Sequence, residues 1–338
     1  MKPTYILAVL SVLCAQVMAQ SFYAPEKSYY FEIPDNAVYI NNRDSIRIGG
    51  ISGIEPAPEN GEFYLIMDKP SPKSGIFTVF IKFDTGNEVS FKRFQEIPVM
   101  NLEGESIRIH PLNNSIYISN EGDRSTNVYQ FMPNNSVKKI KGLRSLTKEM
   151  KFNSGIEGIC FSPDGEFLYA AIERPPEFKN KIPEGTVVSP VCPVFQFFAD
   201  NNKANIITTF GYPLQRKSSG NGISEILTVN DSIIWIIERD YLKKEDRNIV
   251  GIYAVNINKT LHLGDIPVNL HNITELFRPQ QVFEFAKQIK IGNTTAKPGN
   301  IEAACFSHDG RFLILVTDNN FGNHDHTPTQ IYVLRIAE

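Results

Sequence analysis

A short motif recurs five times along this chain, and it limits the folds that are available. The clearest copy covers residues 156–175, IEGICFSPDGEFLYAAIERP, in which two apolar runs flank the turn Ser162-Pro163-Asp164-Gly165. Proline presets φ in this turn and glycine supplies a positive φ, so the copy predicts a β-hairpin. Antiparallel pairing places the start of the first strand beside the end of the second. We therefore expect Glu157 to lie near Glu173 and Arg174.

The other copies begin at residues 51, 102, 223 and 301, and an alternating third strand follows each one. Repeats of roughly 40–50 residues with three or four strands are typical of a β-propeller. The last copy has room for only three strands, so we expect a strand from residues 20–48 to complete it and close the ring. The sequence predicts an all-β chain forming a single β-propeller of five blades. Six blades is the alternative, because the intervals after 156 and 223 are long. Residues 279–287 are the one plausible helix.

Residues 1–19 have the pattern of a targeting segment. Residues 1–19 combine Lys2, an apolar run and a small-residue cleavage pattern, which predicts a signal peptide and leaves 20–338 as one propeller domain. We expect an extracellular protein, or a periplasmic one in a bacterial host. No later run approaches ~18 apolar residues, so no membrane span is expected. The net charge of −3 gives no reason to expect nucleic-acid binding. A monomer is expected.

Cysteines and glycosylation sequons add two smaller expectations. Cys160 and Cys305 occupy the same place in two copies, so with Cys192 they are interpreted as core thiols outside any disulfide. In a eukaryotic host, six N-x-S/T sequons predict a glycoprotein. They start at Asn113, Asn134, Asn230, Asn258, Asn272 and Asn293.

The hairpin argument, applied to all five copies, gathers acidic side chains at one end of the propeller. First strands begin with Ser52, Glu103, Glu157, Ser224-Glu225 and Glu302; second strands end with Asp68, Glu121, Glu173-Arg174, Glu238-Arg239 and Asp318-Asn319. First strands line the propeller axis, so these groups should ring one channel mouth. Crowded carboxylates raise each other's pKa or recruit a cation, and oxygen ligands suit Ca²⁺ or Mg²⁺. Arginines there would pair with an anion such as phosphate. The alternative is a set of solvated or salt-bridged strand ends.

Two other groups are weaker candidates for a site. His324-Asp325-His326 lies in the loop of the last copy and is interpreted as a metal ligand, a base or a solvated loop. Ser52 lacks the G-x-S-x-G spacing of a nucleophile elbow.

The order of these motifs resembles the phytase-like (esterase-like phytase) family of secreted β-propellers. The matching segments are Gly49 to Ile54, Leu102-Glu103-Gly104 with Ser119 to Gly122, Ile156-Glu157-Gly158 with Leu168 to Pro175, Gly222 to Leu227 with Ile237-Glu238-Arg239, and Asn300-Ile301-Glu302 with Val316 to Phe321. Ala303-Ala304 departs from the Gly-Ile that usually follows this glutamate.

The resemblance implies a secreted hydrolase of phosphate or carboxylate esters that uses calcium. In that hypothesis Glu103, Glu157, Glu225, Glu302 and Asp318 hold Ca²⁺, Glu121 or Glu173 is the base, and Arg174 and Arg239 orient an anionic ester. The alternative is a non-catalytic propeller that binds a calcium-bearing or anionic partner at the same mouth.

Overall fold

The computed structural model describes residues 28–41, 44–68, 74–83, 88–99, 102–122, 125–143, 154–175, 191–199, 204–216, 218–259, 280–285, 289–291, 294–296, 298–322 and 327–336. The predicted signal peptide, the His324-Asp325-His326 group and the sequons at Asn272 and Asn293 lie outside these residues.

Five antiparallel sheets of four strands make up most of the described chain. The first is β4 (Ile51–Pro56), β5 (Glu62–Met67), β6 (Gly75–Lys82) and β7 (Glu88–Glu96); the second is β8 (Gly104–Ile109), β9 (Ile116–Gly122), β10 (Ser125–Phe131) and β11 (Val137–Lys139). The third is β12 (Ile156–Phe161), β13 (Phe167–Ile172), β14 (Val191–Phe198) and β15 (Ile206–Pro213); the fourth is β16 (Asn221–Thr228), β17 (Ile233–Leu242), β18 (Arg247–Asn256) and β19 (Gln280–Phe285). The fifth is β22 (Asn300–Phe306), β23 (Phe312–Asp318), β24 (Thr329–Arg335) and β1 (Ser28–Ile33).

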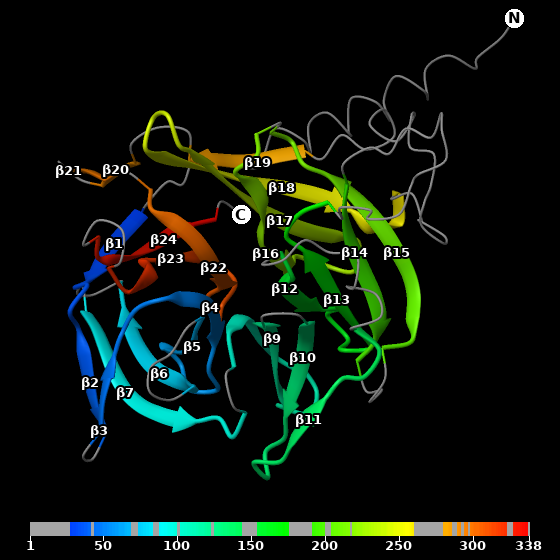
Figure 1. Cartoon of the computed structure of the whole chain (residues 1–338), viewed down its shortest axis with the longest axis horizontal. Helices are drawn as coiled ribbons and strands as arrows, with labels where there is room; N and C mark the ends of the chain where they lie inside the picture. Colours follow the sequence, from blue (N-terminus) through cyan, green and yellow to red (C-terminus); the bar gives the residue numbers. More distant parts are fainter. Residues whose placement is uncertain are drawn as a thin grey trace, which may run out of the picture.

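The sheets are arranged as blades around a central axis (Figure 1). The innermost strands β4, β8, β12, β16 and β22 each contact the next one around the ring, and β22 returns to β4. The N-terminal strand β1 pairs antiparallel with β24, from Ser28 opposite Leu334 to Ile33 opposite Thr329. The prediction that an N-terminal strand closes the last blade is confirmed, and the blade number is five.

Two sequence-based expectations were wrong. The alternative sixth blade does not form from the described residues, because the interval before 301 supplies β19 and a separate hairpin of β20 (Ile289–Ile291) and β21 (Thr294–Ala296). Within the predicted helix at 279–287, residues 280–285 form strand β19, whose backbone pairs with β18. Pairing to the edge of a sheet outweighs a weak helical preference. A further hairpin, β2 (Val38–Asn41) and β3 (Asp44–Arg47), precedes the first blade.

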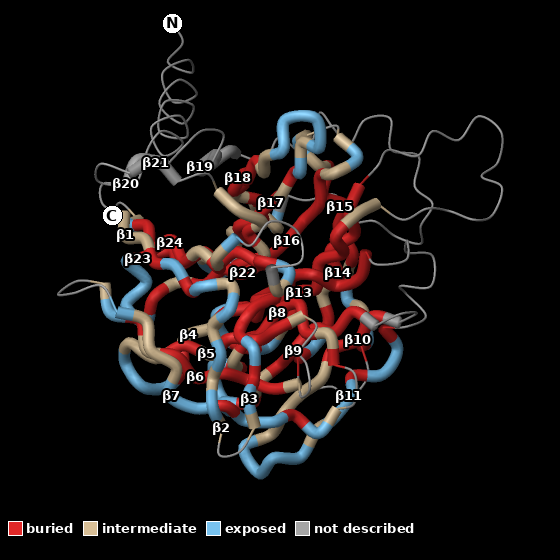
Figure 2. The backbone as a smooth tube through the Cα atoms, turned by 60° about the vertical axis from the view of Figure 1, so that its left-hand side comes forward, coloured by how far each residue is buried: buried red, intermediate tan, exposed pale blue. Residues whose placement is uncertain are grey.

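The core lies between neighbouring blades, and burial decreases toward the outer strands (Figure 2). One apolar cluster joins the first and fifth blades and includes Ile54 and Ile314, both fully buried. The hairpin turns have the predicted chemistry, with φ of +74° at Gly165 and +69° at Gly310. Cys160, Cys192 and Cys305 are buried free thiols, as expected.

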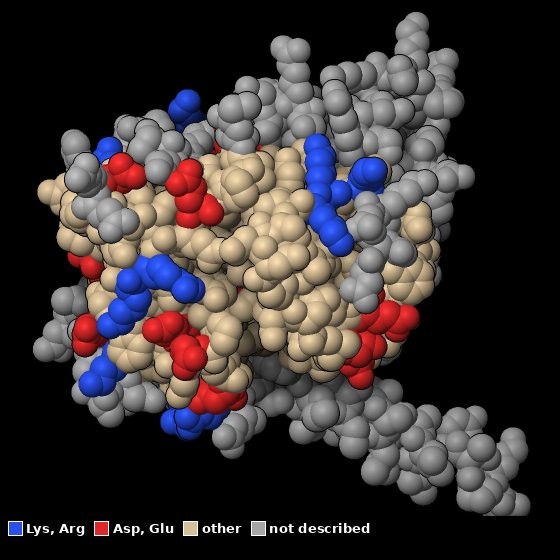
Figure 3. Space-filling view, turned by 90° about the horizontal axis from the view of Figure 1, so that it is seen from below, with Lys and Arg blue, Asp and Glu red and all other residues tan. Residues whose placement is uncertain are grey.

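The surface charge and the length of the helices relate to the predictions about nucleic-acid binding and membrane spans. On the face shown in Figure 3, described basic and acidic residues are interspersed, and no basic patch forms among them. None of the helices in the described residues is long and apolar enough to cross a membrane.

Candidate functional site at the channel mouth

Every innermost strand carries a register shift at the same place. The shifts fall between Ile51 and Gly53, Gly104 and Ile107, Ile156 and Gly158, Ile223 and Glu225, and Ile301 and Ala303. A bulge leaves a residue without a partner on the neighbouring strand and re-aims its side chain. The bulges therefore define a first ring of equivalent positions: Ser52, Glu105, Glu157, Ser224 and Glu302.

A second ring is defined by the residues opposite, at the ends of the second strands. The backbone N–H groups of Asp68, Glu121 and Glu173 donate to the carbonyls of Gly50, Glu103 and Gly155, which shows that the three positions are equivalent. Arg239 lies opposite Gly222 and Asp318 opposite Asn300 in the same register. We call the two rings together the collar: Ser52, Glu105, Glu157, Ser224, Glu302, Asp68, Glu121, Glu173, Arg239 and Asp318.

This register corrects the alignment of the repeats. Leu102-Glu103-Gly104 resembles Ile156-Glu157-Gly158 in sequence, but the structural equivalent of Glu157 is Glu105. In the fourth blade the equivalent is Ser224, one residue before the predicted Glu225. A sequence signal did exist, because every member of the first ring stands two residues before a buried Ile or Ala, as Glu105 does before Ile107.

The collar carboxylates are buried close enough together to perturb one another. Burial and repulsion from Glu173, Glu121 and Glu302 raise the pKa of Glu157. Burial and the neighbouring Glu157, Asp68, Glu302 and Glu121 likewise raise the pKa of Glu105. Each carboxyl thus resists ionisation in the metal-free protein, because the charged form loses water and meets like charges.

Three further acidic members, Asp318, Glu302 and Glu121, also have a raised pKa. Burial, followed by repulsion from Glu302, raises the pKa of Asp318. Burial raises the pKa of Glu302 although Arg239 opposes the shift. Burial raises the pKa of Glu121 to about 7, even though its carboxylate accepts a hydrogen bond from the N–H of Gly155.

Two arginines partly balance these charges. Arg239 Nη2 lies 3.3 Å from Glu173 Oε1 and 3.4 Å from Glu302 Oε1, so it joins the third, fourth and fifth blades. Arg174 Nη2 lies 3.1 Å from the same Glu173 oxygen. The Nε atoms of both arginines are buried and have no hydrogen-bond partner among the described residues. Each guanidinium therefore has one N–H donor that no described residue satisfies.

Arg108 occupies the channel below the collar. Its Nη1 donates to the carbonyls of Ile54 and Ile107 at 3.2 and 2.6 Å, and its Nη2 to those of Ile226 and Ala304 at 3.0 and 3.3 Å. These carbonyls come from the innermost strands of four blades, whose inner edges have no neighbouring strand to pair with. Arg108 therefore spans the channel and satisfies backbone groups that the fold leaves open.

The structure brings together most of the predicted site residues. Glu121, Glu157, Glu173, Glu302, Asp318 and Arg239 are collar members, Arg174 contacts the collar through Glu173, and Glu103 borders it because its charge acts on Glu121. Glu225 is bound elsewhere: its Oε2 lies 2.9 Å from Arg108 Nη2, and Ser106 Oγ donates to both its oxygens. Glu238 is also turned away, since it accepts from Tyr212, Gln215 and Asn221.

A sequence model described as "Phytase-like: Esterase-like activity of phytase" matches residues 46–321, which include all five innermost strands and the whole collar. The chain belongs to the phytase-like family. The family resemblance first drawn from the repeat motifs is confirmed. No curated protein matches this phytase-like chain.

Solved structures with a similar outline share little sequence with this family member. An endo-arabinase from Bacteroides thetaiotaomicron is 10% identical, with a TM-score of 0.48 and coverage of 91% of this chain and 98% of that one. An endo-1,4-beta-xylanase from the same organism is 11% identical, with a TM-score of 0.47 and coverage of 93% and 97%. A hypothetical protein from Leishmania major is 10% identical, with a TM-score of 0.46 and coverage of 97% and 98%. At these values the likenesses carry no argument about function.

Proposed function

We propose that this phytase-like propeller hydrolyses phosphate or carboxylate esters at the collar and depends on Ca²⁺ for that activity. One observation carries the proposal: seven buried or half-buried carboxylates share the collar with a single arginine, and the pKa is raised for Glu105, Glu121, Glu157, Glu302 and Asp318. The seven are Asp68, Glu105, Glu121, Glu157, Glu173, Glu302 and Asp318. Such a site is costly to ionise near neutral pH unless a cation enters it.

The donor set of the collar suits a hard cation. Every acidic collar group is an oxygen donor, which is the ligand type that Ca²⁺ takes. Among the described residues, no three His, Cys, Asp or Glu side chains are placed closely enough to hold a metal. Binding of Ca²⁺ therefore requires the collar carboxylates to move toward one another. Glu105, Glu157, Glu302 and Asp318 would hold the ion, with Glu103 at the edge. When bound, Ca²⁺ would supply charge neutralisation and Lewis-acid polarisation. Glu225 is left out because Arg108 binds it.

Glu121 is the base that the electrostatics favour. Its pKa of about 7 lets it accept a proton from water near neutral pH and release it afterwards. The N–H of Gly155 fixes one of its oxygens. Glu173, the other predicted base, is held by both Arg174 and Arg239. We therefore assign Glu173 to positioning the arginines.

Arg174 and Arg239 would orient an anionic ester. The side chain of Arg174 is 28% exposed and that of Arg239 is 17% exposed, so a ligand in the mouth can reach both. A guanidinium presents donors in a fork that matches phosphate or carboxylate oxygens. Because carboxylates surround both arginines, an anion would be repelled unless the cation neutralised the collar first.

The test is hydrolysis of an aryl phosphate and an aryl acetate, with Ca²⁺ and with a calcium chelator. We expect turnover that the chelator abolishes, and Glu121→Gln should lower kcat by roughly 100-fold or more. Glu88→Gln, an exposed change on β7, is the control with no expected effect. If neither ester is hydrolysed while Ca²⁺ still raises Tm, the protein is a non-catalytic binder that uses the same mouth.

We also propose that the protein is exported through residues 1–19. The support is the charged head, apolar run and small-residue pattern of that segment. N-terminal sequencing of protein recovered from the culture medium or periplasm should begin at Gln20. Retention in cells with an intact Met1 would refute the proposal.

A further inference from the structure

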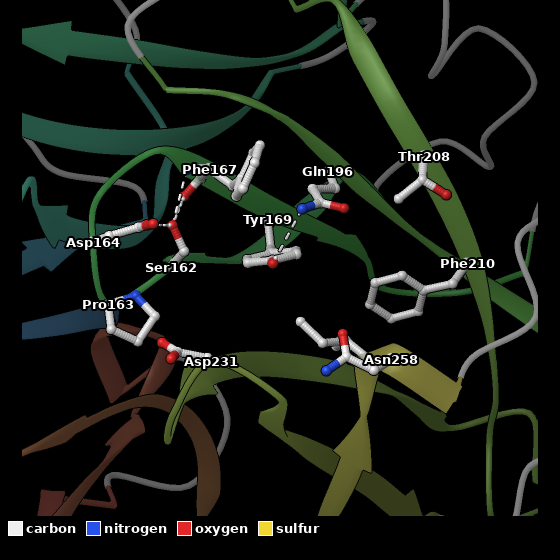
Figure 4. Close-up of a pocket in the computed structure, with 11 residues that line it drawn as sticks. Ser162, Pro163, Asp164, Phe167, Tyr169, Gln196, Thr208, Phe210, Asp231 and Asn258 are labelled. Carbon is white, nitrogen blue, oxygen red and sulfur yellow. Dashed lines mark hydrogen bonds between the residues drawn. The ribbon is translucent and has the colours of Figure 1, made fainter.

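A cavity lies far from the collar, between the third and fourth blades. It encloses about 360 Å³ and is bordered by the turn of the β12–β13 hairpin, by β14 and β15, and by loops of the fourth blade (Figure 4). The turn begins at Ser162, five residues along the strand from Glu157. At ~3.3 Å per residue the cavity is roughly 15 Å or more from the acidic mouth. It therefore belongs to the opposite end of the propeller.

The cavity holds a donor and an acceptor side by side. Gln196 Nε2 donates to Tyr169 Oη at 3.2 Å, which fixes both side chains. The hydroxyl hydrogen of Tyr169 and the Oε1 atom of Gln196 have no hydrogen-bond partner among the described residues and remain available to a ligand. Thr208 and Asn258 also border the cavity (Figure 4).

Aromatic and acidic groups complete the lining. Phe167 is partly exposed at the cavity and packs against Phe198, with ring centroids 5.4 Å apart. Asp164 and Asp231 border the cavity together with Tyr169 (Figure 4). Asp164 Oδ1 accepts from Ser162 Oγ and from the N–H of Glu166, which fixes that carboxylate to its own turn. Asp231, whose carboxylate no hydrogen bond ties to its own turn among the described residues, is the acceptor that we assign to a ligand donor.

These groups discriminate among ligand classes. No described basic side chain lines the cavity, so it offers an anion no charge partner. Tyr169 and Phe210 are only 3% and 2% exposed, so their ring faces do not form an open cage for an organic cation. A neutral molecule with several hydroxyl groups and one apolar face fits amide, hydroxyl and carboxylate partners around a partly exposed ring.

We propose that this cavity is a carbohydrate-binding site that takes a single pyranose unit. Phe167 contacts the apolar face of the sugar, and Asp231 accepts hydrogen bonds from its hydroxyls. Gln196 and Tyr169 supply one acceptor and one donor to neighbouring hydroxyl or amide groups. The site works independently of ester hydrolysis at the collar and would tether the propeller to glycans or polysaccharide.

The experiment is saturation-transfer NMR followed by titration with methyl glycosides of glucose, galactose, mannose and N-acetylglucosamine. The full chain is produced without N-glycans, because Asn258 begins a sequon and an attached glycan would compete for the cavity. We expect at least one glycoside to bind, and Gln196→Ala and Asp231→Asn each to weaken it at least tenfold. Melting curves confirm that both variants fold.

Asp309→Asn is the matched control, since Asp309 lies in the equivalent turn of the fifth blade. It should leave glycoside binding unchanged, and Gln196→Ala should leave Ca²⁺ binding at the collar unchanged. The proposal is overturned if no glycoside binds, if binding survives both cavity substitutions, or if tetramethylammonium binds and the glycosides do not.

Discussion

Arg108 of the second blade and Glu225 of the fourth form an ion pair across the channel, with 2.9 Å between Nη2 and Oε2. The two blades are not neighbours in the ring. Both side chains are almost completely buried, and Arg108 also binds backbone carbonyls from four blades. The pair therefore closes the channel below the collar and ties opposite sides of the propeller together.

Breaking this pair should be strongly destabilising. Arg108→Met removes the partner of a buried charge and leaves the strand-edge carbonyls without donors, which costs about 3–5 kcal/mol in the free energy of unfolding. Denaturant unfolding at pH 7 measures the loss. Adding Glu225→Gln to Arg108→Met should restore part of it. Arg311→Met is the control, since its ion pair with Asp309 is exposed and should contribute about 1 kcal/mol or less.

Closure by β1 should contribute measurably to stability. Ile33 is 4% exposed in the cluster between the first and fifth blades, so Ile33→Ala should cost about 2–4 kcal/mol through lost burial and a cavity. Ile40→Ala is matched in chemistry but sits at a 65% exposed position, so it should change the free energy of unfolding little. Equal effects from the two substitutions would contradict the closure by β1.

The fold was largely predictable because the hairpin motif repeats. Residues such as Pro163 and Gly165 fix the turns, and the shortage of strands after residue 301 requires an N-terminal strand to complete the last blade. The sheet assignment of residues 280–285 was not predictable, since it depends on pairing with β18. Local sequence does not show which strand edge is open.

The candidate site was predictable in location and only partly in membership. Antiparallel pairing correctly places Glu157 near Glu173, because that inference needs only the hairpin, and Glu173 in turn contacts Arg174. In the second blade the sequence motif points to Glu103, but the bulge in β8 shifts the register and places Glu105 in the collar instead. The partner of Glu225 comes from a distant blade, and no local pattern encodes that contact.

The metal-free protein should lose stability as the pH rises. A glutamate in the unfolded chain has a pKa near 4.5. When folding raises that pKa, the protonated carboxyl contributes stability that is fully present below pH 4.5. That contribution is lost as pH rises through the folded value, about 7 for Glu121. We expect Tm in chelator to fall by at least about 5 °C between pH 5 and pH 8. Saturating Ca²⁺ should reverse the fall. A Tm in chelator that rises over this range would contradict the assigned pKa shifts.

Arg239 should distinguish the two ester classes. Arg239→Lys keeps the charge near Glu173 and Glu302 but loses the planar fork. We expect kcat/KM for an aryl phosphate to fall roughly tenfold or more, which corresponds to ~1.4 kcal/mol of transition-state stabilisation. The value for a neutral aryl acetate should change little. Equal losses for both substrates would remove Arg239 from anion recognition.

Calorimetric titration with Ca²⁺ at pH 8 tests the central claim most directly. The wild-type protein should bind Ca²⁺ saturably, Glu105→Gln and Glu157→Gln should each weaken binding at least tenfold, and Glu88→Gln should bind like wild type. Glu105 is the sharper variant, because only the bulged register places it in the collar. Absence of binding to the wild-type protein, or undiminished binding in the Glu105→Gln, Glu157→Gln double variant, would contradict a cation site at the collar.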